Sequence, residues 1–183
     1  MEKIKTKING VFIIKNNLFI DKRGEFMETW NTETFKENNL KINFSQDNIS
    51  ISKKNTLRGL HFQNQPYGQT KYVRVIKGKA LDVVVDIRKE SKTFGKHISI
   101  ELSNNRDGLW IPPGMAHGFL SLEENTIFTY KCSGQYQPKY EHTIKWNDPD
   151  INIQWGTDQP IVSEKDQNGI SLKSYLESNQ ING

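Results

Sequence analysis

The chain has 183 residues, a formal net charge of +4 and 34% hydrophobic residues. No apolar run approaches the ~20 residues of a membrane-spanning helix. We therefore expect one folded domain, residues 1–183, that is neither disordered nor membrane-bound. Its lysines are scattered among acidic residues, which argues against a nucleic-acid partner and is compatible with a small anionic ligand such as a nucleotide diphosphate. The single cysteine, Cys132, cannot form an internal disulfide and no secretory signal peptide is recognised, so we expect a cytoplasmic protein.

Helical patterns are scarce and lie near the two ends of the chain. Residues 32–40 predict one short helix, with Asn31 or Thr32 as its N-cap. Residues 171–177 predict a second short helix. Helices therefore contribute little to the predicted architecture.

Strand patterns dominate between these helices. Candidate strands recur roughly every ten residues from about position 44 to 131, separated by turn signals such as Lys77-Gly78. In Leu81–Arg88, the apolar residues at positions 81, 83, 85 and 87 fall on one face, which predicts a half-buried strand. Ile49 and Ile51 alternate with serines in the same way. Many short strands and few helices predict an all-β sandwich or barrel.

Several catalytic signatures are absent. The chain has no G-x-G dinucleotide fingerprint, no phosphate-binding P-loop and no G-x-S-x-G nucleophile elbow. No motif around Cys132 marks it as a nucleophile. Chemistry based on a dinucleotide, ATP or acyl transfer therefore loses support.

One half of the cupin signature is present. Pro112–His117 matches P-x-G-x-x-H, and cupins are double-sheet jelly rolls. The other half normally supplies H-x-H, but here the second histidine position, two residues after His61, is occupied by Gln63. Glutamine is a poor ligand for a transition metal. We therefore expect no metal and no cofactor, with His61 and His117 free for acid–base work or hydrogen bonding.

A polar cluster is expected around the first histidine. We expect Arg58, His61, Gln63 and Lys71 to point into one cavity from adjacent strands. Such groups in an otherwise apolar barrel require a ligand to satisfy them. The nearby sequence Asp86–Arg88 predicts instead a structural ion pair at a strand end.

Blocks of sequence in a characteristic order add to this interpretation. They are Asp21–Phe26, Phe44–Ser50, Leu57–His61, Val85–Arg88 with Ser91–Gly95, Ile111–Phe119, Ile144–Asp148 and Ser163–Asp166. Through them, from about residue 10 to residue 166, the chain resembles the dTDP-4-dehydrorhamnose 3,5-epimerase family, cofactor-free epimerases of rhamnose biosynthesis. The resemblance implies an all-β, cupin-like double-sheet jelly roll with a few short helices.

The resemblance also implies four catalytic roles. His61 matches the proton acceptor of the family, and Asp166 matches the carboxylate that pairs with this histidine. Tyr130 matches the proton donor, and Lys71 matches the cation near the substrate ketone. Without the resemblance, Tyr130 would be interpreted as a core tyrosine with a satisfied hydroxyl.

Substrate contacts follow from the same resemblance. Contacts with the nucleotide sugar are implied for Gln46, Asp47, Asn48, Arg58, His117, Glu141 and Lys165. Tyr136 matches the aromatic residue that stacks on the nucleotide base. Arg23 and Glu28, with Phe26 close by, match contacts that reach over from a neighbouring subunit. The resemblance therefore implies a homodimer whose N-terminal segment contributes to the partner's site.

The implied chemistry is consistent with these residue types. Epimerisation beside a ketone needs a base on one face of the sugar, an acid on the other and a positive group near the enolate oxygen. His61, Tyr130 and Lys71 have these properties. The expected reaction inverts C3 and C5 of dTDP-4-dehydro-6-deoxy-D-glucose and yields dTDP-4-dehydro-L-rhamnose.

Two alternatives stay open. The first is a relative that acts on another 4-keto nucleotide sugar, such as a GDP-linked heptose, or inverts only C3 or only C5. The second is a non-catalytic, cupin-like module that binds a sugar nucleotide. A metal-dependent cupin oxygenase is disfavoured by Gln63, and a 3,4-ketoisomerase by the lack of a second histidine close to His61.

Overall fold

Two antiparallel sheets face each other in the computed structural model, which describes residues 1–104 and 106–178. The last five residues of the predicted domain, residues 179–183, therefore lie outside the described part. The order of strands in the first sheet is β1 (Glu2–Lys5), β2 (Phe12–Lys15), β10 (Asp107–Ile111), β7 (Lys71–Lys77), β12 (Thr126–Ser133) and β5 (Phe44–Ser52). The order in the second is β13 (Glu141–Thr143), β6 (Thr56–Gln63), β11 (Met115–Ser121), β8 (Lys79–Asp86) and β9 (His97–Ser103), and β14 (Ile161–Val162) pairs with β6.

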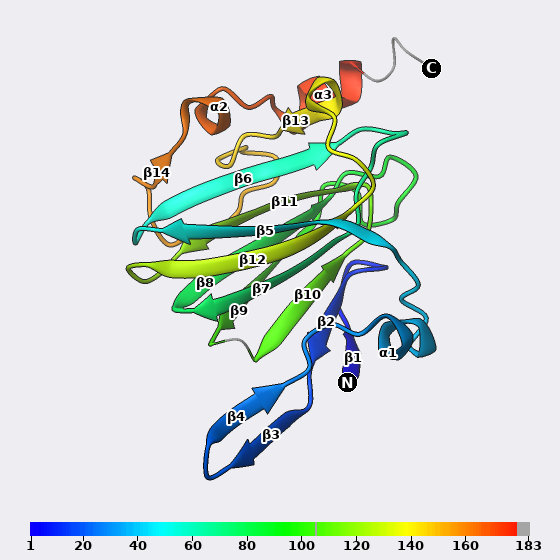
Figure 1. Cartoon of the computed structure of the whole chain (residues 1–183). Helices are drawn as coiled ribbons and strands as arrows, with labels where there is room; N and C mark the ends of the chain where they lie inside the picture. The colour runs from blue at the N-terminus through cyan, green and yellow to red at the C-terminus, as the bar shows by residue number, and fades with distance from the viewer. Residues whose placement is uncertain (105, 179–183) are drawn as a thin grey trace.

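The remaining elements lie outside these two sheets. The strands β3 (Leu18–Asp21) and β4 (Gly24–Met27) form a separate hairpin that projects from the body of the molecule (Figure 1). The helices are α1 (Thr32–Glu37), the 3₁₀ turn η1 (Pro138–Tyr140), α2 (Glu164–Gln167) and α3 (Leu172–Ser178). Within the described residues, no helix is long and apolar enough to cross a membrane.

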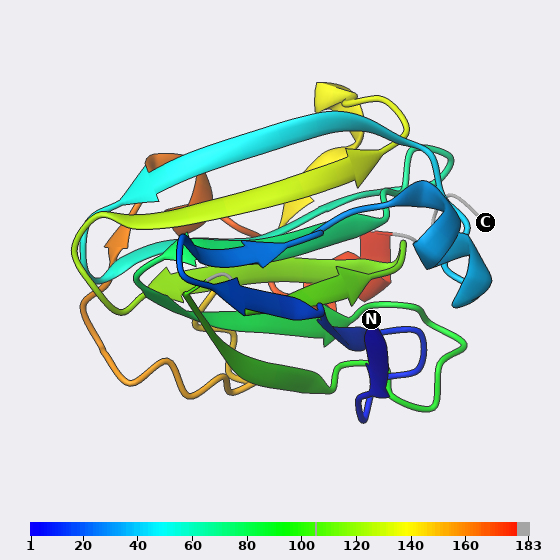
Figure 2. The ribbon, with the colours of Figure 1, turned by 60° about the horizontal axis from the view of Figure 1, so that its bottom comes forward.

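The two predicted helices are confirmed, with small shifts of their ends. Asn31 is the N-cap of α1, because its side-chain oxygen accepts hydrogen bonds from the backbone N–H groups of Glu33 and Thr34. Phe35 of α1 packs against Trp30 and Tyr72 over the outer face of the first sheet. Figure 2 shows α1 at one end of the sheets.

The core also has a layer on each face of the second sheet, because this sheet is covered on both faces. Between the sheets, Val75 of β7, Val84 of β8 and Phe128 of β12 belong to one buried cluster. On the outer face of the second sheet, Val83 packs in a separate cluster with Trp155 and other residues of the C-terminal segment. Figure 1 shows β14, α2 and α3 beside β6, on the side opposite the hairpin.

This second layer corrects the prediction that Leu81–Arg88 forms a half-buried strand. The predicted apolar face does pack, but against the C-terminal segment. The opposite face, with Asp82, Val84 and Asp86, is also fully buried, because it faces the interior of the jelly roll. Asp86 accepts hydrogen bonds from Arg88, which confirms the predicted structural ion pair.

In β5 the apolar side chains of the alternating pattern face outward, and the serines face the interior. Ile49 and Ile51 are 67% and 64% exposed, whereas Ser50 and Ser52 face inward. Figure 2 shows β5 along the edge of its sheet, where β12 is the one strand of the described residues that pairs with it. An edge strand therefore presents an apolar outer face.

Candidate active site

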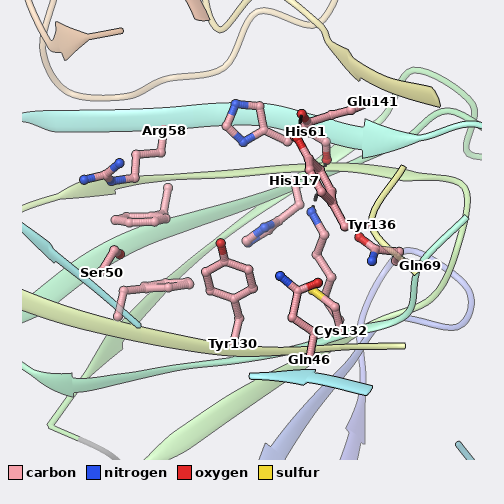
Figure 3. Close-up of a pocket in the computed structure, with 13 residues that line it drawn as sticks. Gln46, Ser50, Arg58, His61, Gln69, His117, Tyr130, Cys132, Tyr136 and Glu141 are labelled. Atoms are coloured by element: carbon pink, nitrogen blue, oxygen red, sulfur yellow. Dashed lines mark hydrogen bonds between the residues drawn. The ribbon is translucent and has the colours of Figure 1, made fainter. Parts of the chain in front are cut away.

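A cavity of about 310 Å³ opens between the two sheets. Side chains from both sheets converge on it (Figure 3). They are Gln46 and Ser50 of β5, Arg58 and His61 of β6, Gln69 of the loop before β7, Lys71 at the start of β7, His117 and Phe119 of β11, Phe128, Tyr130 and Cys132 of β12, Tyr136 of the next loop, and Glu141 of β13. The cavity combines cations, acid–base groups and an apolar wall.

An irregularity in β6 brings Arg58 and His61 to the same cavity. Three residues apart, they would face opposite sides of a regular strand. In β6, His61 pairs with His117 and Arg58 pairs with Phe119, so β6 has one residue more than β11 between these pairs. Such a bulge redirects a side chain. Lys71 faces them from β7 in the opposite sheet, so the expected origin on adjacent strands is wrong, and Gln63 does not line the cavity.

His61 forms a close pair with Asp166. The Nε2 atom of His61 lies 2.5 Å from Oδ1 of Asp166, and the backbone N–H of Gly59 donates to Oδ2 at 3.2 Å. Burial by itself raises the pKa of Asp166, but the hydrogen bond and charge of His61, together with the Gly59 N–H and Ser163, lower it overall. Asp166 is therefore a carboxylate at neutral pH.

Gly59 makes this arrangement sterically possible. Its φ of 137° lies in a region that favours glycine, and a Cβ atom there would stand 2.5 Å from the Cα of Gly118 on β11. The close approach of β6 and β11 thus places the Gly59 N–H against Asp166.

Tyr130 and Lys71 face the cavity from the first sheet. The hydroxyl of Tyr130 points into the cavity in Figure 3. Burial raises the pKa of Tyr130, so its hydroxyl keeps its proton at neutral pH. Burial lowers the pKa of Lys71, whose Nζ donates to the backbone oxygen of His61 at 3.4 Å.

His117 forms a second histidine–carboxylate pair. Its Nε2 lies 2.9 and 3.1 Å from the two carboxylate oxygens of Asp82, and both side chains are buried. The sequence interpretation included His117 but missed Asp82. Because Asp82 lies on the interior face of β8, it fixes the orientation of the His117 ring.

A chain of polar contacts lies at one end of the cavity. The hydroxyl of Tyr136 donates to Oε2 of Glu141 at 2.7 Å, and Nζ of Lys165 lies 2.5 Å from the same oxygen. Burial raises the pKa of Glu141, but the hydrogen bonds from Lys165 and Tyr136 outweigh this effect and lower it. Glu141 is therefore ionised, and it joins Tyr136 to the segment that carries Asp166.

Several lining residues were missed by sequence reasoning. They are Ser50, Gln69, Phe119, Phe128 and Cys132. Each lies two residues along a strand or its approach from a predicted residue, and Ser50 is two residues from Asn48. The period-two rule applied to the predicted site residues would have found them. The rings of Phe119 and Phe128 stack 4.0 Å apart and form the apolar wall.

The structure does not bring every predicted residue to the cavity. The carboxylate of Asp47 lies on the outer face of β5, where it pairs with Lys131 at 2.6 Å. Asn48 donates to the backbone oxygen of Tyr130 at 3.5 Å without lining the cavity. Arg23, Phe26 and Glu28 belong to the hairpin and the segment after it. None of these three residues lines the cavity of its own chain.

The described residues contain no group of three or more His, Cys, Asp or Glu side chains arranged to hold a metal ion. The two cavity histidines are each bonded to one carboxylate, Asp166 or Asp82. Gln63, which occupies the second position of the H-x-H motif, directs its amide to backbone groups outside the cavity.

The fold and the cavity together define a jelly-roll enzyme equipped for proton transfer. A sequence model described as dTDP-4-dehydrorhamnose 3,5-epimerase matches residues 5–174. The chain belongs to this family and is a nucleotide-sugar epimerase, an isomerase with a cupin-like jelly roll. The sequence-based predictions of family, fold class and enzyme class are confirmed.

Individual relatives agree over nearly the whole chain. The dTDP-4-dehydrorhamnose 3,5-epimerase of Methanothermobacter thermautotrophicus is 48% identical over 174 residues, which cover 93% of this chain and 94% of the relative. The Legionella pneumophila enzyme, solved in complex with dTDP-4-keto-L-rhamnose, superposes with a TM-score of 0.90 at 39% identity, covering 94% of this chain and 93% of its own. A 3'-monoepimerase from Streptomyces bikiniensis, solved with dTDP-quinovose, gives a TM-score of 0.91 at 31% identity and covers 96% and 90%.

Proposed function

We propose that this protein inverts C3 and C5 of dTDP-4-dehydro-6-deoxy-D-glucose, giving dTDP-4-dehydro-L-rhamnose. The observation that carries the proposal is one cavity lined by His61, Tyr130 and Lys71, in which His61 is hydrogen-bonded to the carboxylate of Asp166. The names of the relatives, one of them solved with the corresponding product, support the same substrate.

His61 is the proposed base. Asp166 accepts a hydrogen bond from Nε2 when the ring carries its proton there, which leaves the lone pair of Nδ1 to take a proton from the sugar. The carboxylate stabilises the imidazolium that forms. Proton removal from the carbon beside the ketone leaves an enolate, whose negative charge resides mainly on the ketone oxygen.

Lys71 is the proposed partner of this oxygen. Its ammonium lies in a poorly hydrated environment, where a charge interacts more strongly than it does in water. Tyr130 is the proposed acid, and it returns a proton from the face of the sugar opposite His61. Since C3 and C5 both neighbour the C4 ketone, the same groups serve both centres in turn.

The nucleotide part of the substrate is assigned to the surrounding residues. Arg58 suits a diphosphate because a guanidinium binds two phosphate oxygens at once. Tyr136 stacks on the base, next to Glu141 and Lys165. Gln46 and His117 supply hydrogen bonds, as do Asp47 and Asn48 through the backbone or side chain of β5.

A homodimer completes the site in this proposal. The β3–β4 hairpin carries Arg23 at its tip and exposes Phe19 and Phe26, and none of them lines the cavity of its own chain. The outer face of β5 exposes Ile49 and Ile51. Two apolar surfaces without a cover in one chain support an interface in which Arg23, Phe26 and Glu28 reach the partner's cavity.

We further infer that residues 1–183 act as one catalytic domain, because both sheets contribute side chains to one cavity. We also infer a cytoplasmic location. Its support is the single cysteine, Cys132, which is a buried free thiol, as expected in a reducing compartment.

A second candidate reaction is inversion at C3 alone. The observation that favours it is the close structural match to the 3'-monoepimerase. Both reactions use the same acid–base groups, so the fold and the proposed residues are compatible with each.

Proton exchange distinguishes these candidates. The protein is incubated in D₂O with dTDP-4-dehydro-6-deoxy-D-glucose, and NMR follows deuterium at C3 and C5 together with the configuration of each carbon. The proposal expects deuterium and inversion at both carbons. Exchange and inversion confined to C3 would support the monoepimerase, and no exchange at either carbon would contradict both. A GDP-linked 4-keto sugar in a parallel reaction tests the choice of nucleotide.

A further inference from the structure

Gln63 directs its whole amide to two loops beside the cavity. Its Nε2 donates to the backbone oxygen of Tyr67 at 2.7 Å and to that of Gln135 at 3.1 Å. Its Oε1 accepts a hydrogen bond from the backbone N–H of Gln137 at 2.6 Å. Both N–H groups and the oxygen are thus engaged, and the side chain is only 7% exposed.

The two bonds to Gln135 and Gln137 enclose Tyr136. Tyr136 is 50% exposed and lies in the loop between β12 and the one-turn helix η1. Its hydroxyl bonds to Glu141, which pairs with Gln63 itself in the β13–β6 ladder. The position of the Tyr136 ring therefore depends on contacts that start from β6, the strand that carries His61.

The bond to Tyr67 holds the other loop. This loop leads from β6 to β7 and carries Gln69, which lines the cavity. Beyond it, the backbone N–H of Thr70 donates to Oγ of Ser133 at 2.9 Å, and Ser133 N–H donates to the Thr70 oxygen at 3.0 Å. Gln63 thus bridges the two loops at the same side of the cavity.

We propose that Gln63 is a positioning residue for nucleotide binding, whose amide holds the 135–137 backbone so that Tyr136 stands where the base stacks. This inference rests on the proposed role of Tyr136. It also accounts for an amide, not an imidazole, at this position, because one side chain here donates twice and accepts once. An imidazole has only two nitrogen atoms for these three bonds.

The first test measures, without any ligand, how strongly the hydrogen bonds of Gln63 stabilise the 134–140 segment. In Gln63→Met, which keeps the length of the side chain and removes all three hydrogen bonds, we expect hydrogen exchange in the 134–140 segment to accelerate about tenfold or more. In Tyr136→Ala, where the bonds of Gln63 remain, we expect exchange near the wild-type rate. Gln154→Met is the matched control on a remote exposed loop and leaves this segment unchanged.

The second test measures binding of dTDP by calorimetry. Loss of a base–aromatic stack predicts about a tenfold rise in Kd for Tyr136→Ala and a similar or smaller rise for Gln63→Met. The double variant binds no more weakly than Tyr136→Ala, within about twofold, because both changes remove one contact. In turnover, Gln63→Met raises KM and leaves kcat within about twofold of wild type.

Three results would overturn the proposal. They are unchanged exchange of the 134–140 segment in Gln63→Met, equal and additive losses of dTDP affinity in the double variant, and a fall in kcat at constant KM. If Tyr136→Ala weakens dTDP binding and Gln63→Met does not, the role of Gln63 alone fails. If neither variant weakens binding, the proposed role of Tyr136 fails with it.

A second variant protects the test against misfolding. Gln63→Glu has the same shape and keeps an acceptor for the Gln137 N–H, but it cannot donate to Tyr67 or Gln135 as a carboxylate. It is expected to change exchange and dTDP affinity in the same direction as Gln63→Met. Wild-type values for Gln63→Glu would contradict the proposal.

Discussion

Tyr130 is the residue whose removal separates proton exchange from inversion. In Tyr130→Phe, His61 still takes a proton and returns deuterium to the same face, while no hydroxyl delivers one from the opposite face. We expect deuterium to enter at C3 and C5 with retained configuration, and the inverted product to fall by about 10²-fold or more. NMR of the reaction in D₂O measures both quantities.

Two outcomes would contradict this assignment of Tyr130. Inversion of both centres at the wild-type rate would make another group or water the acid. Equal loss of exchange and inversion would mean that Tyr130 is needed before the enolate forms. The neighbouring ring of Phe128, whose centroid lies 6.3 Å from that of Tyr130, offers a control, since Phe128→Leu changes the apolar wall and keeps the hydroxyl of Tyr130.

His61 and Asp166 are expected to differ in the size of their effects. His61→Asn removes the base, so exchange at both carbons should fall by about 10²–10⁴-fold with the fold intact. Asp166→Asn keeps the imidazole but loses the negative charge that stabilises its protonated form, so the loss should be smaller. The rate of deuterium exchange measures the loss in each variant, and circular dichroism checks that each variant keeps its fold. Near wild-type exchange in His61→Asn would show that this histidine is structural.

Among the elements, the end of β8 carries a carboxyl group, that of Asp86, whose ionisation stabilises the fold. Burial acts to raise the pKa of Asp86, but hydrogen bonds from Arg88, Ser91 and Thr93 outweigh it and lower the pKa to about 2. A carboxyl whose pKa is lower in the folded chain adds stability that is fully present above its unfolded value of about 3.9 and is lost as pH falls toward the folded value.

This sign gives a prediction for Asp86→Asn. At pH 7 the free energy of unfolding should fall by about 2.5 kcal/mol, since the pKa of Asp86 is lowered to about 2 and one pKa unit corresponds to about 1.4 kcal/mol. The difference from wild type should shrink between about pH 4 and pH 2, where Asp86 itself becomes protonated. Urea titrations across this range measure it, with the exposed Asp158→Asn as control. A difference that stays constant down to pH 2 would contradict the linkage.

At the scale of the whole molecule, the prediction concerns the shared site. Arg23→Ala and His61→Ala should each be inactive as homodimers if Arg23 serves the partner's cavity. After subunit exchange, one site of a mixed dimer contains both Arg23 and His61, so activity should return to at most about half of the wild-type value per mixed dimer. This fraction follows from the count of intact sites in a two-fold dimer.

The control for this experiment is a mixture in which complementation is impossible. His61→Ala mixed with Asp166→Asn changes two residues that contact each other within one chain. Each variant chain then supplies a defective pair, and every site of the mixed dimer contains one. Recovery by this mixture alone, or no recovery by the first mixture despite proven subunit exchange, would refute the shared site.

Local signals decided much of the architecture. Period-two patterns predicted the strand content, and Asn31 predicted a helix start that depends only on contacts with the next three residues. The turn at Gly78 falls between β7 and β8 as predicted, with a φ of 81°. These features were accessible because their hydrogen bonds join residues that are close in sequence.

The sequence by itself determined the all-β architecture, which follows from short-range patterns. It also determined the family and most of the side chains that line the cavity, which follow from ordered sequence blocks that resemble those of the family. Only the tertiary structure decided which neighbour covers each face of a strand, as for buried Asp82 and exposed Ile49. It also decided how the bulge in β6 directs His61, and that Gln63 bonds to Gln137, 74 residues away. A pattern along one strand defines two faces, but the packing of distant segments determines what each face contacts.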